Sequence, residues 1–198
     1  MTWAAGSVID RVVDPRPHLD ASRRAFLRGG AFGLLALALG PRLALAAAGQ
    51  ARRLRAVSIH TAERVDLVFH DGRGYDPDAL TALERFLRDP FTGEAHPIDP
   101  AVLDIAWSVA RAAGREATPF DVVCGYRSPA TNARLHARSP RGVDANSLHL
   151  AGRAIDLRLP GLPLARLREV AHRLQVGGVG FYPQDDFVHL DSGRPRSW

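Results

Sequence analysis

The sequence of 198 residues contains one cysteine and no lysine. A single cysteine, Cys124, excludes an internal disulfide, so the domain must be held together by its hydrophobic core. All 26 basic residues are arginines, and they are spread along the chain instead of forming a block. Such a spread is not typical of a nucleic-acid surface, and we expect no nucleic-acid partner.

The sequence also lacks two motifs of common hydrolases. No H-E-x-x-H pair is present, which excludes the familiar helical zinc protease. Without a G-x-S-x-G elbow, nothing else supports a serine hydrolase built from Ser147, His149 and Asp156. Cys124 lies in a short apolar strand pattern, so we interpret it as a core residue and not as a nucleophile.

No apolar run reaches the roughly 20 residues that a membrane-spanning helix needs. The run from Gly29 to Gly40 follows Ser22-Arg-Arg-Ala-Phe-Leu-Arg28 and precedes a stretch of small residues. This order indicates an export signal, and the paired arginines are typical of the twin-arginine route, which carries folded proteins across the bacterial inner membrane. We expect residues 1–50 to be this signal, cleaved near Ala46 or Ala48. An uncleaved inner-membrane anchor is the alternative.

Residues 51–198 predict one domain. The first fifty residues hold six arginines and three aspartates, so the rest of the chain carries only about +2 of the formal net charge of +5. With 46% hydrophobic residues, the chain is long enough for one core and too short for two. Exported by the twin-arginine machinery, this domain would work in the periplasm, and we expect a monomer.

Strand and helix patterns follow one another irregularly along this domain. Period-two segments at 54–60 and 64–70 predict a hairpin, and Asp-Pro pairs at 76–77 and 99–100 predict helix starts. Further patterns predict strands over 120–124, 153–159, 179–182 and 187–191, and helices over 128–136 and 163–175. Because strands and helices do not alternate regularly, we expect an α+β fold with a small antiparallel sheet flanked by helices.

Two histidines and one aspartate form the most informative pattern of the chain. In Ser147-Leu-His-Leu-Ala-Gly-Arg-Ala-Ile-Asp156, His149 stands seven residues before Asp156, with Gly152 between them. A tight turn at Gly152 can bring the His149 segment beside the strand that follows, so that both side chains converge. On that strand, Asp156 lies on the face opposite the apolar residues. His189, on the last predicted strand, supplies a third corner. Such nitrogen and oxygen ligands are those of a catalytic zinc with an open fourth position.

Several separated motifs agree in order with a known family. They are Gly125-Tyr-Arg-Ser-Pro129, Asn132-Ala133, Asn146-Ser-Leu-His149, Gly178-Val-Gly-Phe-Tyr-Pro183 and Phe187-Val-His-Leu-Asp-Ser-Gly193. Together with the ligand pattern they resemble the zinc D-Ala-D-Ala peptidase family (peptidase M15), and within it the exported YcbK-like murein endopeptidase branch.

The resemblance implies a hedgehog/D-Ala-D-Ala peptidase-like fold, one zinc ion, and hydrolysis of peptide crosslinks in peptidoglycan by metal-activated water. Two alternatives stay open. One is a D,D- or L,D-carboxypeptidase or dipeptidase of the same family, and the other is a non-catalytic peptidoglycan-binding relative.

The resemblance also implies roles for individual residues. Arg127 resembles the basic residue that stabilises the carbonyl oxygen or anchors a substrate carboxylate. The family usually places its general base three residues before the last zinc histidine, where this chain has Asp186. Asp191 is the alternative, either as the base or as a partner that orients a metal ligand.

Overall fold

The computed structural model describes residues 49–139 and 142–198. The predicted export signal, including Ala46 and Ala48, lies outside the described residues except for its last two positions. Within the described part, no helix is both long enough and apolar enough to cross a membrane.

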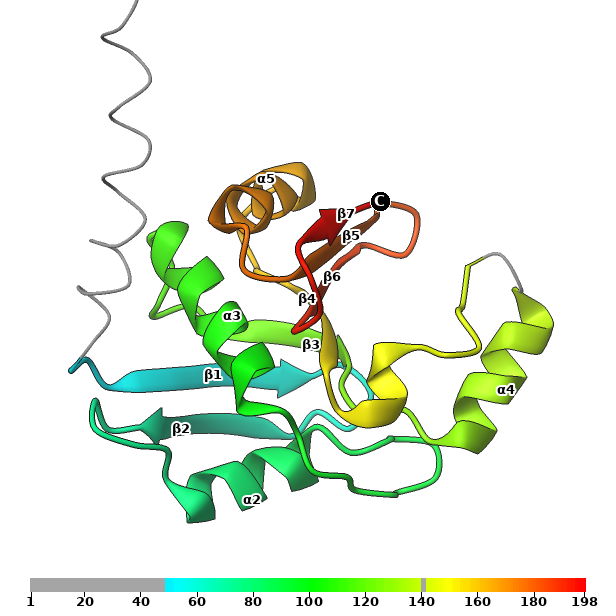
Figure 1. Ribbon diagram of the computed structural model, residues 1–198, viewed down its shortest axis with the longest axis horizontal. Helices are drawn as coiled ribbons and strands as arrows, with labels where there is room; N and C mark the ends of the chain where they lie inside the picture. The colour runs from blue at the N-terminus through cyan, green and yellow to red at the C-terminus, as the bar shows by residue number, and fades with distance from the viewer. Residues whose placement is uncertain (1–48, 140–141) are drawn as a thin grey trace, which may run out of the picture. The chain divides into compact units, whose positions relative to one another are not determined.

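In this part of the chain, seven strands form one sheet in the order β2-β1-β3-β4-β6-β5-β7 (Figure 1). The strands are β1 (Arg52–Ser58), β2 (Arg64–His70), β3 (Phe120–Cys124), β4 (Ala154–Arg158), β5 (Gly178–Tyr182), β6 (Phe187–Asp191) and β7 (Arg196–Ser197). The helices are α2 (Pro77–Phe86), α3 (Pro100–Ala112), α4 (Pro129–Arg138), α5 (Leu164–Leu174) and the short 3-10 helix η1 (Leu148–Ala151).

The sheet is larger than predicted and mixed in direction. Antiparallel pairs join β1 to β2, β3 to β4, β4 to β6 and β5 to β6, whereas β1–β3 and β5–β7 are parallel. The prediction of a small antiparallel sheet is therefore wrong. Strand β2 and helices α2 and α3 lie between β1 and β3 in the chain, and a connection of this length lets β3 run parallel to β1. The combination of strands with flanking helices is confirmed.

Helix starts follow the caps that the sequence predicts. Asp76, Asp99 and Ser128 each precede a helix, and each side chain accepts a hydrogen bond from the backbone of the first turn. A proline follows each cap, in a position where no backbone N–H is needed. These local signals explain why α2, α3 and α4 begin where they do.

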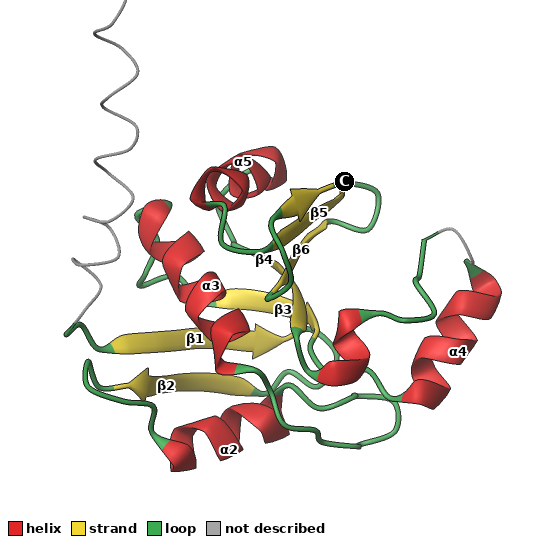
Figure 2. Ribbon diagram, viewed as in Figure 1, coloured by secondary structure: helices red, strands yellow, loops and turns green. Residues whose placement is uncertain are grey.

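One hydrophobic core lies between the sheet and helices α3 and α5, and α2 packs on β2 at the edge (Figure 2). Its fully buried side chains include Leu54, Phe69, Leu83, Leu103, Phe120, Ile155, Leu157, Leu167 and Leu190. Strand β4 is central, and its residues 154–157 are all buried. Because successive side chains point to opposite faces, Ile155 and Leu157 enter the core while Asp156 is buried on the other face.

The turn that joins η1 to β4 requires a glycine at position 152. Gly152 and Gly114 have nearly the same positive φ, 64° and 65°. A Cβ at Gly152 would lie 2.1 Å from the carbonyl oxygen of Pro97, whereas one at Gly114 would meet no described atom within 4 Å.

We therefore expect Gly114→Ala to lower the free energy of unfolding by about 1 kcal/mol, the cost of the left-handed conformation. Gly152→Ala should lower it by clearly more, because Pro97 must also move. Urea unfolding of both variants measures this difference, and equal losses would contradict the close approach at Gly152.

Candidate metal centre

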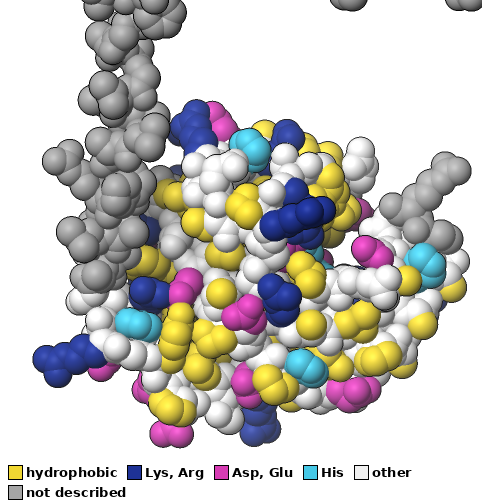
Figure 3. All heavy atoms as spheres, viewed as in Figure 1, with side chains coloured by type: hydrophobic (Ala, Val, Ile, Leu, Met, Phe, Trp, Pro, Cys, Tyr) yellow, Lys and Arg dark blue, Asp and Glu magenta, His cyan; other side chains and the backbone are white. Residues whose placement is uncertain are grey.

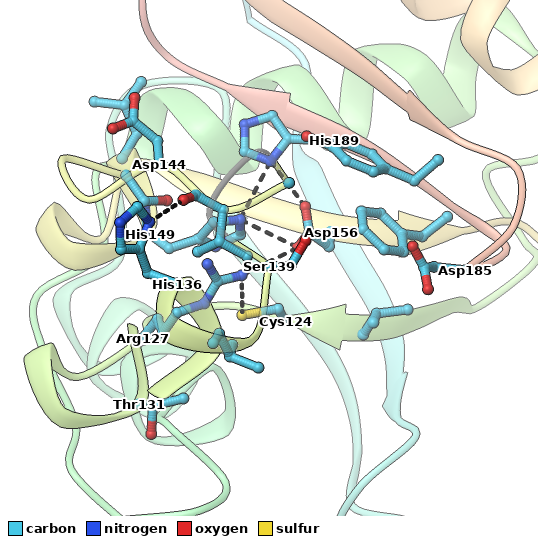
Figure 4. Close-up of a pocket in the computed structure, with 18 of the residues that line it drawn as sticks. Cys124, Arg127, Thr131, His136, Ser139, Asp144, His149, Asp156, Asp185 and His189 are labelled. Atoms are coloured by element: carbon cyan, nitrogen blue, oxygen red, sulfur yellow. Dashed lines mark hydrogen bonds and ion pairs between the residues drawn. The ribbon is translucent and has the colours of Figure 1, made fainter. Parts of the chain in front are cut away.

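The candidate site is built on a row of directly opposed residues that crosses four strands. The register pairs Cys124 of β3 with Asp156 of β4, Asp156 with His189 of β6, and His189 with Gly180 of β5. Opposed residues point to the same face of a sheet. Cys124, Asp156 and His189 therefore project into one hollow (Figure 4).

His149 reaches this row from η1. The hydroxyl of Ser147 caps η1 by accepting a hydrogen bond from the backbone N–H of His149 at 3.4 Å, and Gly152 then turns the chain into β4. The Nδ1 atom of His149 donates to the carbonyl oxygen of Gly125 at 2.7 Å. Because a carbonyl can only accept, Nδ1 carries a proton, and Nε2 is the nitrogen that faces Asp156. The predicted tight turn at Gly152 is confirmed.

Two ring nitrogens and both oxygens of one carboxylate converge in this hollow from the three residues predicted to bind the metal. Nε2 of His149 lies 3.2 Å from Oδ2 of Asp156 and 3.2 Å from Nδ1 of His189, and that Nδ1 lies 2.8 Å from Oδ1 of Asp156. The residues His149, Asp156 and His189 are only 2%, 3% and 8% exposed. A tetrahedral zinc with bonds of about 2.0–2.1 Å holds its ligand atoms roughly 3.3 Å apart, so the spacing of these atoms fits the ion.

The protonation pattern of the histidines supports the same conclusion. Nε2 of His189 pairs with Oδ2 of Asp191 at 3.1 Å, and a carboxylate can only accept, so with a metal ion at Nδ1 both rings use their outer nitrogen as a donor. The inner nitrogens then carry lone pairs that face each other and a carboxylate. Such a set of acceptors is stable only with a proton or a metal ion between its members.

The charges of the site are strongly coupled. Burial opposes a positive charge on His149, but the Asp156 carboxylate outweighs this effect and raises the pKa of His149 to about 10. Burial also opposes ionisation of Asp156, yet the neighbouring His149 and His189 lower its pKa below the usual range. Without a metal, the hollow therefore holds a proton that balances Asp156. A metal cation would replace that proton, which couples binding to proton release.

Arg127 borders the three ligands. Its Nη2 lies 3.7 Å from Oδ2 of Asp156 and donates to Sγ of Cys124 at 3.6 Å, and its Nη1 donates to Oδ1 of Asn132 at 3.2 Å. Its buried Nε has no hydrogen-bond partner among the described residues. Arg127 thus lies in the site, with its guanidinium beside Asp156.

Cys124 belongs to the site, although we interpreted it from the sequence as a core residue. Its side chain lines the pocket, and Sγ lies within 4.8 Å of ligand atoms of His149 and Asp156. The register shifts between Val122 and Cys124, which breaks the alternation of β3. Cys124 therefore leaves the core face that Phe120 and Val122 occupy. With His149 and Asp156 it forms a group that could itself hold a metal ion.

The pocket around these ligands has a volume of about 1100 Å³. Helix α4 and the segment that follows it line one side, and β5 and β6 line the other; the space-filling view shows the hollow between them (Figure 3). On the second side, the rings of Tyr182 and Phe187 stack at 4.6 Å, and Nε1 of Trp198 donates to the Tyr182 hydroxyl at 2.8 Å. We call Tyr182, Phe187 and Trp198 the aromatic wall.

The two acids considered as general base lie in different surroundings. Asp186 is 63% exposed at its side chain, its carboxylate accepts from Nη1 of Arg158 at 2.8 Å, and it is not among the described residues that line the pocket. Its neighbour Asp185 does line the pocket (Figure 4). Asp191 is fully buried behind His189. Its Oδ2 accepts from Nε2 of His189, and its Oδ1 accepts from the backbone N–H of Gly193. This placement suits the second predicted role of Asp191, orienting a metal ligand, while the base role of Asp186 stays a prediction.

The family of the chain follows from comparison with known proteins. A family model described as peptidoglycan L,D-endopeptidase MepK matches residues 46–198. The chain belongs to this family of M15 peptidases. The MepK assignment confirms the resemblance seen in the motifs, and with it the predicted enzyme class, a peptidase.

Two relatives show how far the similarity extends. The chain is 38% identical over 180 residues to peptidoglycan L,D-endopeptidase MepK of Escherichia coli strain K12, covering 90% of this chain and 98% of the relative. It is 35% identical over 182 residues to a probable peptidoglycan L,D-endopeptidase MepK of Haemophilus influenzae, covering 91% and 97%. The MepK similarity therefore spans nearly the whole of both relatives.

A solved structure, the L-Ala D-Glu endopeptidase ChiX of Serratia marcescens, is a more distant match. It is 20% identical with a TM-score of 0.31, and the match covers 39% of this chain and 62% of that one. A likeness of this extent supports no conclusion about the MepK-family chain.

Asp89 anchors the α4 side of the pocket. It is fully buried, and its carboxylate accepts from the backbone N–H of Ser128 and of Phe91, each at 2.9 Å. Burial opposes its charge, but hydrogen bonds from Thr131, Ser128 and Phe91 outweigh burial and lower the pKa of Asp89 to about 2. A lowered pKa stabilises the fold above the unfolded value of about 4, and this contribution is lost as the pH falls towards 2.

We expect the free energy of unfolding of the wild type to fall more steeply between pH 4 and 2 than that of Asp89→Asn, by on the order of 2 kcal/mol. Denaturant unfolding at a series of pH values measures this difference. Asp78→Asn, at an exposed aspartate of α2, should keep the wild-type pH dependence. A parallel pH dependence in wild type and Asp89→Asn would show that Asp89 does not anchor this side.

Proposed function

We propose that the chain is a zinc-dependent murein endopeptidase that hydrolyses peptide crosslinks of peptidoglycan, with His149, Asp156 and His189 as the zinc ligands. The observation that carries the proposal is the convergence of these three buried side chains in a chain of the MepK family. The relatives are named L,D-endopeptidases, and we extend that bond type to this chain. We also extend to it the hedgehog/D-Ala-D-Ala peptidase-like fold of the family.

When bound, zinc polarises a carbonyl group and lowers the pKa of water towards neutrality. The residues around it must then stabilise negative charge and move a proton. Arg127, held by Asn132 and Cys124 and lining the pocket beside Asp156, is placed to bind the oxygen of the scissile carbonyl or a substrate carboxylate.

Proton transfer to the leaving amine requires a carboxylate that reaches the pocket. Asp186 fills this role only if it exchanges Arg158 for the substrate, whereas Asp185 already lines the pocket. Asp191 does not serve as the base in this arrangement, because its oxygens are occupied behind His189.

The shape of the pocket favours an endopeptidase over a carboxypeptidase or dipeptidase. An enzyme that cuts within a crosslink needs room for peptide on both sides of the scissile bond. The pocket extends from the ligands towards α4, where Leu135 lines it, and towards the aromatic wall on the other side. A carboxypeptidase would need one of these sides closed around a terminal carboxylate.

We further propose that the chain is exported by the twin-arginine machinery and acts in the periplasm as a monomer. The motif from Ser22 to Arg28 and the small residues before Ala46 and Ala48 support this location. The twin-arginine route carries folded proteins.

Replacing one ligand tests the proposed function directly. We expect His189→Ala to lose zinc retention and the release of crosslinked muropeptides together, because only two ligands remain. His172→Ala, at an exposed histidine of α5, should keep both. Zinc is measured by atomic absorption after dialysis, and mass spectrometry of products from purified sacculi also identifies the bond that is cut. Wild-type protein without zinc, or full digestion by His189→Ala, would overturn the proposal.

Cys124 provides an independent test of where the metal binds. It is the only cysteine of the sequence, so alkylation reports on this position alone. Because Sγ lies within 4.8 Å of the His149 and Asp156 ligand atoms, we expect bound zinc to slow alkylation by iodoacetamide several-fold, and a chelator to restore the rate. The protection should be absent in His189→Ala. Equal alkylation rates in zinc-loaded and metal-free wild type would place the metal elsewhere.

A further inference from the structure

The last residues of the chain reach back to the metal centre. Strand β7 pairs in parallel with β5 (Figure 1), and the backbone N–H of Trp198 donates to the carbonyl oxygen of Val179 at 3.3 Å. We call residues 193–198 the tail. Its pairing with β5, the strand next to β6, holds the side chain of Arg196 over Asp191.

Arg196 and Asp191 form a bidentate ion pair. Nη1 of Arg196 lies 3.0 Å from Oδ1 of Asp191, and Nη2 lies 2.7 Å from Oδ2. Asp191 is fully buried, and apart from His189 no other basic side chain of the described residues forms an ion pair with it. A buried carboxylate needs such compensation, and a planar guanidinium can serve both oxygens at once.

Two glycines make room for this ion pair. A Cβ at Gly178 would lie 2.3 Å from Oδ2 of Asp191 and 2.5 Å from Nη1 of Arg196. A Cβ at Gly193 would lie 2.8 Å from Oδ1 of Asp191 and 3.0 Å from Nη1 of Arg196. The backbone N–H of Gly193 also donates to Oδ1 at 2.8 Å. Any side chain at these positions would push the ion pair apart, so the local backbone is fitted to it.

Trp198 packs against Arg196 and His189. Its ring lies 4.8 Å from the guanidinium carbon of Arg196 and 5.3 Å from the ring of His189. The first contact is a cation–π interaction that favours one orientation of the guanidinium. Arg196 is therefore held between the aromatic wall and the partner of a proposed zinc ligand.

We propose that Arg196 is a positioning residue of the metal centre. It holds Asp191 where Oδ2 accepts from Nε2 of His189 at 3.1 Å, and this hydrogen bond keeps the proton of His189 on Nε2. The lone pair of Nδ1 is then left to face His149 and Asp156. The inference rests on the proposed function for the identity of the metal ligands, but the tautomer of His189 can be measured without metal.

The test compares Arg196→Gln and Arg196→Lys with Arg194→Gln. Arg194 is an exposed arginine of the same tail whose side chain forms no ion pair with Asp191, so its variant removes the same charge and leaves the Arg196–Asp191 pair intact. Zinc affinity is measured by competition with a chromophoric chelator. We expect Arg196→Gln to bind zinc about 10- to 100-fold more weakly, the usual effect of losing an outer partner of a metal ligand. Arg196→Lys should fall in between, and Arg194→Gln should match the wild type.

The second measurement is the tautomer of His189 in the metal-free protein, from long-range ¹H–¹⁵N NMR. We expect the Nε2–H form of His189 in wild type and Arg194→Gln, and a mixture of both tautomers in Arg196→Gln. Circular dichroism checks that each variant is folded. If Arg196→Gln does not fold, Arg196→Lys decides, because one ammonium cannot serve both oxygens of Asp191.

The two readouts separate this inference from the proposed function. Wild-type zinc affinity together with an unchanged His189 tautomer in the folded Arg196 variants would overturn the positioning role and leave the peptidase proposal standing. A protein that binds no zinc but changes tautomer in Arg196→Gln would overturn the zinc assignment and support the positioning role.

Discussion

The buried carboxylate of Asp156 is the group to which the rest of the site is arranged. A charge in a protein interior is costly unless neighbouring groups compensate it. Here the compensation comes from His149 on η1, His189 on β6 and Arg127 in the segment between β3 and α4. The histidines meet Asp156 with the ring nitrogens that lack a fixed proton, because their outer nitrogens are used elsewhere. They can therefore balance the charge with a proton or share it with a metal ion, which a permanent arginine–aspartate pair could not do.

The sheet makes this arrangement possible by fixing which face each residue occupies. Strand β4 is buried on both faces, with Ile155 and Leu157 in the core and Asp156 in the pocket. A slip of β4 by one residue would move Asp156 into the core and both apolar side chains out of it. Core packing therefore holds the ligand register between β4 and β6. The same period of two puts His189 and Asp191 on one face, so a proposed ligand and its hydrogen-bond partner come from a single strand.

Features that depend on local sequence could be predicted, and features that depend on strand pairing could not. The turn at Gly152 and the seven-residue spacing around it are local, and the structure brings His149 and Asp156 together as that spacing predicts. The direction of Cys124 depends on a register shift against β4, which leaves no trace in the alternation of β3. Asp186 turns towards Arg158, an arginine 28 positions earlier, and no short-range pattern indicates such a contact. The two-residue β7 is also too short to give a periodic signal.

The tail connects the stability of the sheet to the geometry of the site. Gly178 and Gly180 weaken β5, because glycine adds no side-chain packing and loses much conformational entropy when it folds into a strand. The space that they leave is filled from the tail: Arg196 lies over Gly178, and the ring of Trp198 lies over Gly180. The groups that stabilise β5 thus also hold Asp191 behind His189. Folding of this edge of the sheet and placement of His189, the proposed metal ligand, are therefore coupled, since Arg196 and Trp198 reach Asp191 and His189 only when β5, β6 and β7 are paired.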